Sequence, residues 1–151
     1  LTELLPAALG IKNGDAKIIK NAGGVISHPF GSAVRSLLIA IYELGVTDVM
    51  VIGHTDCGVQ HMDGKKMLRE MEERGVSANS LNMVRYFGID LERWLTGFYD
   101  VAQAVSSSVE LLRSHPLIPS DVKIYGYIMD SVTGELTDVN ELVQPNGAKQ
   151  A

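Results

Sequence analysis

The sequence contains a single cysteine, Cys57, among its 151 residues. One cysteine excludes a disulfide within the chain and is typical of a reducing compartment, so we predict a cytoplasmic location. The sequence also lacks an apolar run of about 18 residues, the length that a membrane-spanning helix needs, and its first residues show no basic segment leading into an apolar one. We therefore predict no membrane association, and the visible sequence shows no signal peptide.

An excess of positive charge is absent as well. Lys and Arg number 13 against 18 Asp and Glu, which gives a formal net charge of −5. Proteins that bind nucleic acids cluster basic residues where phosphates lie. The nearest basic patch here, Lys65-Lys66, continues into the mixed charges of residues 69–74, which is typical of a solvated helix face. We therefore predict no nucleic-acid partner.

The residues that are present suit one ordinary core, because 46% are hydrophobic and 21% are charged. We predict a single domain over residues 1–151, with a loose tail after about residue 144. Apolar periodicity and glycine or proline breaks predict strands over 16–20, 48–53, 122–129 and 136–139, and helices over 32–44, 65–74 and 81–115, the last broken near Gly88 and Gly97. This alternation predicts an α/β fold with a mostly parallel sheet.

A candidate metal site comes after the apolar strand at 48–53. His54 and Cys57 lie directly beyond it, three positions apart, in a turn where both side chains can point at one ion. Thiolate sulfur and imidazole nitrogen are ligands that zinc prefers. On spacing alone the alternative stays open that Cys57 is a small buried apolar residue and His54 only satisfies loop backbone groups.

Several stretches of the sequence resemble the β-class carbonic anhydrases. In that family a strand ends in a G-H-T-D-C-G turn, which residues 53–58 reproduce. Further similar stretches are residues 20–24 and 34–37, then 108–119, 122–130 and 133–136, so that the resemblance spans about residues 1–140 in the family's order. It implies a three-layer fold with helices flanking the sheet, and a Zn²⁺ bound by His54 and Cys57. The implied activity is reversible hydration of carbon dioxide to bicarbonate and a proton.

The sequence departs from the family at its beginning. In the family a second zinc cysteine opens a C-x-D-x-R motif at the end of the first sheet strand, and its Asp and Arg form a pair beside the metal. Residues 1–5 resemble the family's segment just after that motif, so the motif would lie before Leu1. We expect an intact protein that carries it. The alternative is a natural zinc-deficient relative, and the catalytic residues are unknown from this sequence.

Glycines at the ends of predicted strands are candidates for a substrate pocket, because ligands of such sheets sit outside the carboxyl ends of the strands. We predict that Gly23, Gly24 and Gly58 contribute backbone to that pocket, where a missing side chain lets a small substrate come close. The plainer alternative for Gly23 and Gly24 is a tight turn with positive φ. Two neighbouring polar residues also have two interpretations: Asp56 caps the turn or orients a ligand, and His61 is an exposed loop residue or a proton relay.

Two other classes of function remain open. The same scaffold could carry a zinc hydrolase of carbonyl sulfide or carbon disulfide, because the zinc ligands do not fix which linear triatomic molecule enters. It could also be a non-catalytic oligomer with an incomplete metal site. The apolar and aromatic residues of the 81–99 segment exceed what one small sheet covers, and the family is built on dimers, so we predict a homodimer or tetramer.

Overall fold

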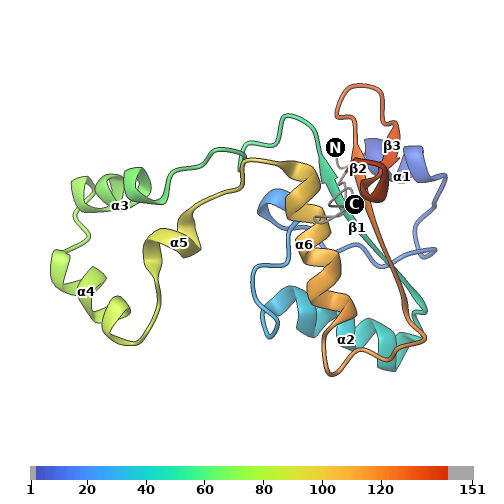
Figure 1. The fold of residues 1–151 in the computed structure, drawn as a ribbon, viewed down its shortest axis with the longest axis horizontal. Helices are drawn as coiled ribbons and strands as arrows, with labels where there is room; N and C mark the ends of the chain where they lie inside the picture. The colour runs from blue at the N-terminus through green and yellow to red at the C-terminus, as the bar shows by residue number, and fades with distance from the viewer. Residues whose placement is uncertain (1–2, 143–151) are drawn as a thin grey trace, which may run out of the picture. The chain divides into compact units, whose positions relative to one another are not determined.

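The computed structural model describes residues 3–142 (Figure 1). Contacts within the chain divide it into two compact units, one made of the residues up to Cys57 together with those from Asp100 onward, and one made of residues 58–99. Each unit is described by itself, and the single domain over residues 1–151 stays a prediction. The tail predicted to be loose after about residue 144 lies outside the described residues.

The first unit contains a sheet of three strands in the order β1-β2-β3. Strands β1 (Asp48–His54) and β2 (Lys123–Met129) pair in parallel, from Asp48 opposite Lys123 to His54 opposite Met129. The short strand β3 (Leu136–Asp138) pairs antiparallel with β2. These strands confirm the predictions over 48–53, 122–129 and 136–139, and they make His54 the last residue of β1. The sheet that they form is small and mixed, with one parallel and one antiparallel pairing.

Helix α6 (Val101–Arg113) packs against β1 and β2 (Figure 1). Its N-terminus is capped by Asp100, whose carboxylate accepts from the backbone N–H of Ala102 at 2.8 Å. The helix comes close because each facing strand has a glycine: a Cβ at Gly53 would lie 2.8 Å from a methyl carbon of Val105, and one at Gly126 would lie 3.0 Å from another. This contact forms the core under the sheet, together with buried apolar side chains at Val49, Val51, Val109, Leu112, Ile124 and Ile128.

The remaining elements of the first unit are α1 (Leu4–Leu9), the 3₁₀ turn η1 (Ala22–Gly24), α2 (Ser32–Leu44) and α7 (Val139–Leu142). The prediction of a helix over 32–44 is confirmed, with Gly45 ending it at φ 69°. The prediction of a strand over 16–20 is wrong. Residues 17–20 are exposed and carry no ladder, and only an isolated bridge joins Asn13 to Ala16. A strand sequence needs a partner strand to pair with, and no strand of residues 3–142 pairs with this segment.

The second unit is helical, with α3 (Gly64–Glu73), α4 (Ala78–Tyr86) and α5 (Leu91–Leu95). Its small core is formed by Leu68, Leu81 and Leu91, one from each helix, with Met71, Val84 and Leu95 packed around them. The predicted breaks near Gly88 and Gly97 are confirmed, since α4 and α5 end before them. None of the helices within residues 3–142 has the length and apolar character that a bilayer crossing requires.

Candidate metal centre

The turn after β1 is held to the end of β2. Thr55 continues the parallel ladder, because its backbone N–H donates to the Met129 carbonyl at 3.0 Å. The chain then reverses at Asp56, which has φ 54°, a left-handed conformation that aspartate tolerates better than most residues. Two residues after Thr55 the turn reaches Cys57. The turn is therefore a fixed continuation of the sheet, and it starts from the half-buried His54.

The imidazole of His54 is held in one orientation. Its Nδ1 lies 2.8 Å from the backbone carbonyl oxygen of Thr55. A carbonyl oxygen only accepts hydrogen bonds, so Nδ1 carries the proton in this contact. The other nitrogen, Nε2, then keeps its lone pair, and this is the arrangement in which a neutral histidine binds a metal ion.

Cys57 supplies the second donor of the turn. It is buried, with 7% of its surface exposed, and it is the only cysteine of the chain. Imidazole nitrogen and thiolate sulfur both suit Zn²⁺, so the chemistry of this pair fits a zinc site. Within residues 3–142, however, no group of three or more His, Cys, Asp or Glu side chains is arranged to hold a metal ion. His54 and Cys57 therefore remain predicted ligands, and a catalytic zinc site uses three protein ligands.

The glycine turn lies beside the end of β1 that carries His54. Gly23 is buried with φ 85°, and Gly24 has φ 62°. A Cβ at Gly24 would lie 2.7 Å from the backbone oxygen of Ile52 and 3.7 Å from the Cα of Gly53. The plainer interpretation, a tight turn with positive φ, is therefore confirmed, and the close approach at Gly24 is to the backbone of β1. A role of these glycines in a substrate pocket stays a prediction.

The other predicted residues lie at exposed or partly exposed positions. Gly58 is exposed, and a Cβ there would meet nothing within 4 Å, so its pocket role stays a prediction. Asp56 is exposed in the turn. His61 is exposed in the second unit, where its ring lies 5.3 Å from that of Tyr99 in an edge arrangement. This environment agrees with a loop histidine, and its alternative role as a proton relay stays a prediction.

The sequence around this turn matches a known protein family. The family model described as "Carbonic anhydrase" matches residues 5–136, which include the glycine turn, β1, the His54–Cys57 turn and β2. The chain belongs to the β-carbonic anhydrase family.

Relatives and solved structures agree with that family. The chain is 49% identical over 136 residues to YvdA of Bacillus subtilis (strain 168), whose name assigns it provisionally to the carbonic anhydrases; the match covers 90% of this chain and 69% of YvdA. It is 30% identical over 169 residues to a carbon disulfide hydrolase of Acidithiobacillus thiooxidans, covering 100% of this chain and 81% of that protein. The crystal structure of β-carbonic anhydrase isoform I from Trichomonas vaginalis matches with a TM-score of 0.81 and 33% identity, over 92% of this chain and 75% of that one. The α/β fold expected from the resemblance is confirmed.

In this β-carbonic anhydrase family member, a second turn braces the turn of residues 54–57, the candidate metal turn. It links β2 to β3 and is closed by Asp130, whose carboxylate accepts from the backbone N–H of Val132 and of Thr133, each at 2.8 Å. The Gly134 N–H donates to the Asp130 carbonyl at 2.9 Å. Ser131 within this turn donates its N–H to the Thr55 hydroxyl at 2.9 Å. Sequence reasoning missed Thr55 and Ser131, because 76 positions separate them and neither is a zinc ligand type.

The carboxylate of Asp130 has a lowered pKa. The backbone N–H of Thr133, then that of Val132, stabilise the charged form and hold the pKa below its ordinary value of 3.8. Because the folded-state pKa is depressed, the charged carboxylate stabilises the fold above the ordinary value, and this contribution is lost as the pH falls through the folded-state pKa.

We expect Asp130→Asn to remove that acid dependence. Thermal unfolding of the parent chain, followed from about pH 5 to about pH 2, should lose a component of stability that the variant does not lose. Asp121→Asn, at an exposed aspartate of the same unit, is the control and should unfold like the parent over the same conditions. Identical acid profiles for the parent and Asp130→Asn would contradict the bracing role of this carboxylate.

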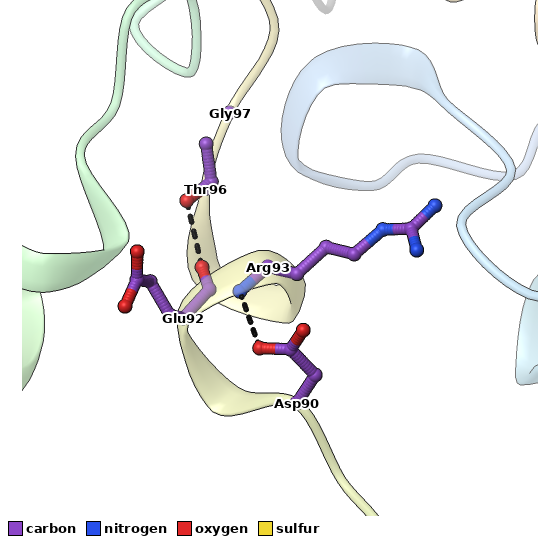
Figure 2. Close-up of a pocket in the computed structure, with 5 residues that line it drawn as sticks. All are labelled: Asp90, Glu92, Arg93, Thr96 and Gly97. Carbon is purple, nitrogen blue, oxygen red and sulfur yellow. Dashed lines mark hydrogen bonds between the residues drawn. The ribbon is translucent and has the colours of Figure 1, made fainter.

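The second unit contains a cavity of about 600 Å³ (Figure 2). It is lined by Asp90, Glu92, Arg93, Thr96 and Gly97. Two of its polar side chains make hydrogen bonds at the ends of α5. The Asp90 carboxylate accepts from the Arg93 N–H at 3.1 Å, and the Thr96 hydroxyl donates to the Glu92 carbonyl at 2.6 Å (Figure 2). The groups that Figure 2 joins are thus capping interactions of α5, and the candidate metal centre remains the turn after β1.

Proposed function

We propose that this protein catalyses the zinc-dependent, reversible hydration of carbon dioxide to bicarbonate and a proton. The observation that carries the proposal is the state of His54 in a chain of the β-carbonic anhydrase family. Its Nδ1–H is committed to the Thr55 carbonyl at 2.8 Å, which leaves Nε2 free to bind a metal, and the buried thiol of Cys57 lies three positions later in the same turn.

We propose the following roles for the chain's own residues. His54 Nε2 and Cys57 Sγ would hold the zinc, and the rigid connection of their turn to β2 would fix the angle between them. Gly24 would keep side-chain atoms away from the end of β1, where a small apolar substrate must approach. When bound, zinc would lower the pKa of a water molecule to about 7, which makes a nucleophile available at neutral pH.

A catalytic zinc site uses three protein ligands, and His54 and Cys57 would supply two of them. Residues 3–142 hold no group of three donors, and the residues beyond them in this sequence, 1–2 and 143–151, contain no His, Cys, Asp or Glu. We propose that the third ligand is a cysteine of the C-x-D-x-R motif in an intact-length protein, as the family resemblance implies. The Asp and Arg of that motif would act beside the metal.

Zinc content and hydration rate test the proposed function together. The intact-length protein, dialysed against a mild chelator, should retain about one zinc per chain by elemental analysis, and stopped-flow assays should show hydration of carbon dioxide. The 151-residue chain serves as the comparison and should retain less zinc, because it offers two ligands. An intact-length protein without zinc would instead support the non-catalytic alternative.

Hydrolysis of carbon disulfide or carbonyl sulfide is the second candidate. It is favoured by the 30% identity, over the whole of this chain, to a carbon disulfide hydrolase of Acidithiobacillus thiooxidans. Carbon disulfide is also a linear triatomic molecule, and its complete hydrolysis with two waters yields carbon dioxide and two molecules of hydrogen sulfide. Sulfide release from carbon disulfide by the zinc-loaded protein, without hydration of carbon dioxide, would favour this candidate.

We also propose a homodimer or tetramer, supported by aromatic exposure in the second unit. Tyr86 is 87% exposed, Phe87 75%, Trp94 67% and Tyr99 77%, whereas aromatic side chains of this size usually gain stability from burial. The rings of Tyr86 and Phe87 lie 5.9 Å apart at the end of α4, where they form an apolar pair. A cytoplasmic location remains a prediction from the lone cysteine.

Replacing that pair should weaken self-association. Light scattering should give the parent a mass of two or four times 16.4 kDa, and the double variant Tyr86→Ser, Phe87→Ser should dissociate at a protein concentration roughly 10-fold higher or more. Val132→Ser, at a position 83% exposed in the first unit, is the matched control and should leave the mass unchanged. A monomeric parent, or a double variant that associates like the parent, would contradict this proposal.

A further inference from the structure

The hydroxyl of Thr55 makes hydrogen bonds to Ser131 and is not itself a proposed zinc ligand. Its Oγ1 accepts the backbone N–H of Ser131 at 2.9 Å and lies 3.1 Å from the Ser131 hydroxyl, so the two side chains share a hydrogen bond as well. Both residues are half-buried, and no buried side-chain polar atom within residues 3–142 lacks a partner. The pair therefore ties the metal turn to the turn between β2 and β3.

Thr55 is consequently fixed through three different groups. Its N–H donates to the Met129 carbonyl at 3.0 Å, its hydroxyl is bound to Ser131, and its carbonyl accepts the Nδ1–H of His54 at 2.8 Å. The first contact holds the residue against β2, and the second holds it to the turn between β2 and β3. With the N–H and the side chain anchored, the carbonyl has little freedom to turn away from the imidazole.

The anchor itself is rigid. Ser131 comes directly after Asp130, whose carboxylate and carbonyl accept three backbone N–H groups of the same turn, and the Asp130 N–H donates to the Glu135 carbonyl at 2.8 Å. A hydroxyl bound to such a turn has a defined position, in contrast to one bound to solvent. The geometry thus forms a chain from the β2–β3 turn through Ser131 and Thr55 to the imidazole of His54.

We propose that Thr55, anchored by Ser131, is a positioning residue that selects the Nδ1–H tautomer of His54 and so presents Nε2 to the metal. This inference rests on the proposed function for its consequence, metal binding, but its first step is a property of the metal-free chain. Histidine ligands generally donate their second ring N–H to a carbonyl or carboxylate, and loss of that outer partner typically lowers metal affinity by roughly 10–100-fold.

The first test reads the tautomer without any metal. In the metal-free 151-residue chain, ¹⁵N shifts of the His54 ring should report a proton on Nδ1. Thr55→Val removes the hydroxyl at similar volume, and we expect the proton to redistribute between Nδ1 and Nε2. Thr55→Ser keeps a hydroxyl and should restore the parent spectrum. Retention of the pure Nδ1–H form in folded Thr55→Val would overturn the proposal.

The second test measures metal affinity by chelator competition in the intact-length protein. We expect Thr55→Val to weaken zinc binding by roughly 10–100-fold and Thr55→Ser to restore most of it. Thr133→Val is the matched control: it removes a hydroxyl that accepts the Glu135 N–H at 3.2 Å in the same β2–β3 turn without contacting Thr55. If this control lowered affinity as much as Thr55→Val, general loosening of the turn would explain the effect and the positioning role would be rejected.

The two tests separate this inference from the proposed function. A parent protein that binds no zinc, while its His54 tautomer still depends on the Thr55 hydroxyl, would refute the function and keep the positioning role. If the parent binds zinc, but Thr55→Val changes neither the His54 tautomer nor the zinc affinity, the positioning role is refuted and the proposed function stands. Should Thr55→Val fail to fold, Ser131→Ala removes the hydroxyl partner alone, leaves the Ser131 N–H in place, and should give a smaller change of the same sign.

Discussion

His54→Ala should abolish zinc retention and carbon dioxide hydration in the intact-length protein. The substitution removes the Nε2 lone pair that the Thr55 carbonyl, 2.8 Å from Nδ1, keeps available for a metal. Loss of an outer-shell partner alone typically costs roughly 10–100-fold in affinity or activity, so we expect loss of a direct ligand to exceed about 100-fold in both. Elemental analysis after dialysis and stopped-flow hydration assays measure the two effects.

His28→Ala is the matched control for that experiment. His28 is an exposed histidine of the same unit, and its ring Nδ1 accepts the Phe30 N–H at 3.0 Å in a local turn. The control should keep zinc and activity close to the parent values. If His54→Ala also kept its zinc and its hydration rate, the assignment of His54 as a ligand, and with it the proposed function, would be wrong.

Elements with strong local signals were predictable from the sequence. The helix over 32–44 shows apolar residues at helical spacing and ends at Gly45, and the strand β1 is a short apolar run that stops at the motif of residues 53–58. The breaks near Gly88 and Gly97 are indicated by glycine alone. Such features depend on neighbours within a few positions, which a sequence displays directly.

Features that depend on distant partners were not predictable. The 16–20 segment has the composition of a strand, yet strand formation requires a pairing edge that composition does not reveal. His115 precedes a proline, a position that gives no sign of burial, but it is buried, and its Nε2 lies 2.7 Å from the Pro29 carbonyl oxygen, 86 positions away. The hydrogen bond between Thr55 and Ser131 likewise joins residues that are far apart in the sequence. The motif therefore identified two candidate ligands but not the contacts that orient them.

Gly24→Ala adds only one methyl group, but it should clearly destabilise the first unit. Gly24 has φ 62°, where an L-residue costs about 1–2 kcal/mol. The added Cβ would also lie 2.7 Å from the Ile52 backbone oxygen, and such overpacking costs about 1–3 kcal/mol more. We expect the free energy of unfolding, measured with urea, to fall by about 2–5 kcal/mol.

Gly45→Ala separates the two causes of that loss. Gly45 has φ 69°, close to the angle at Gly24, but a Cβ there meets nothing within 4 Å. Its cost should therefore be the conformational part alone, about 1–2 kcal/mol. The additional loss of stability in Gly24→Ala measures how tightly the glycine turn packs on the end of β1, at Ile52, two residues before His54. In the intact-length protein, Gly24→Ala should therefore also weaken zinc binding, and Gly45→Ala should not. Equal costs for the two variants would mean that the glycine turn does not press on β1, and its place in a substrate pocket would lose its structural support.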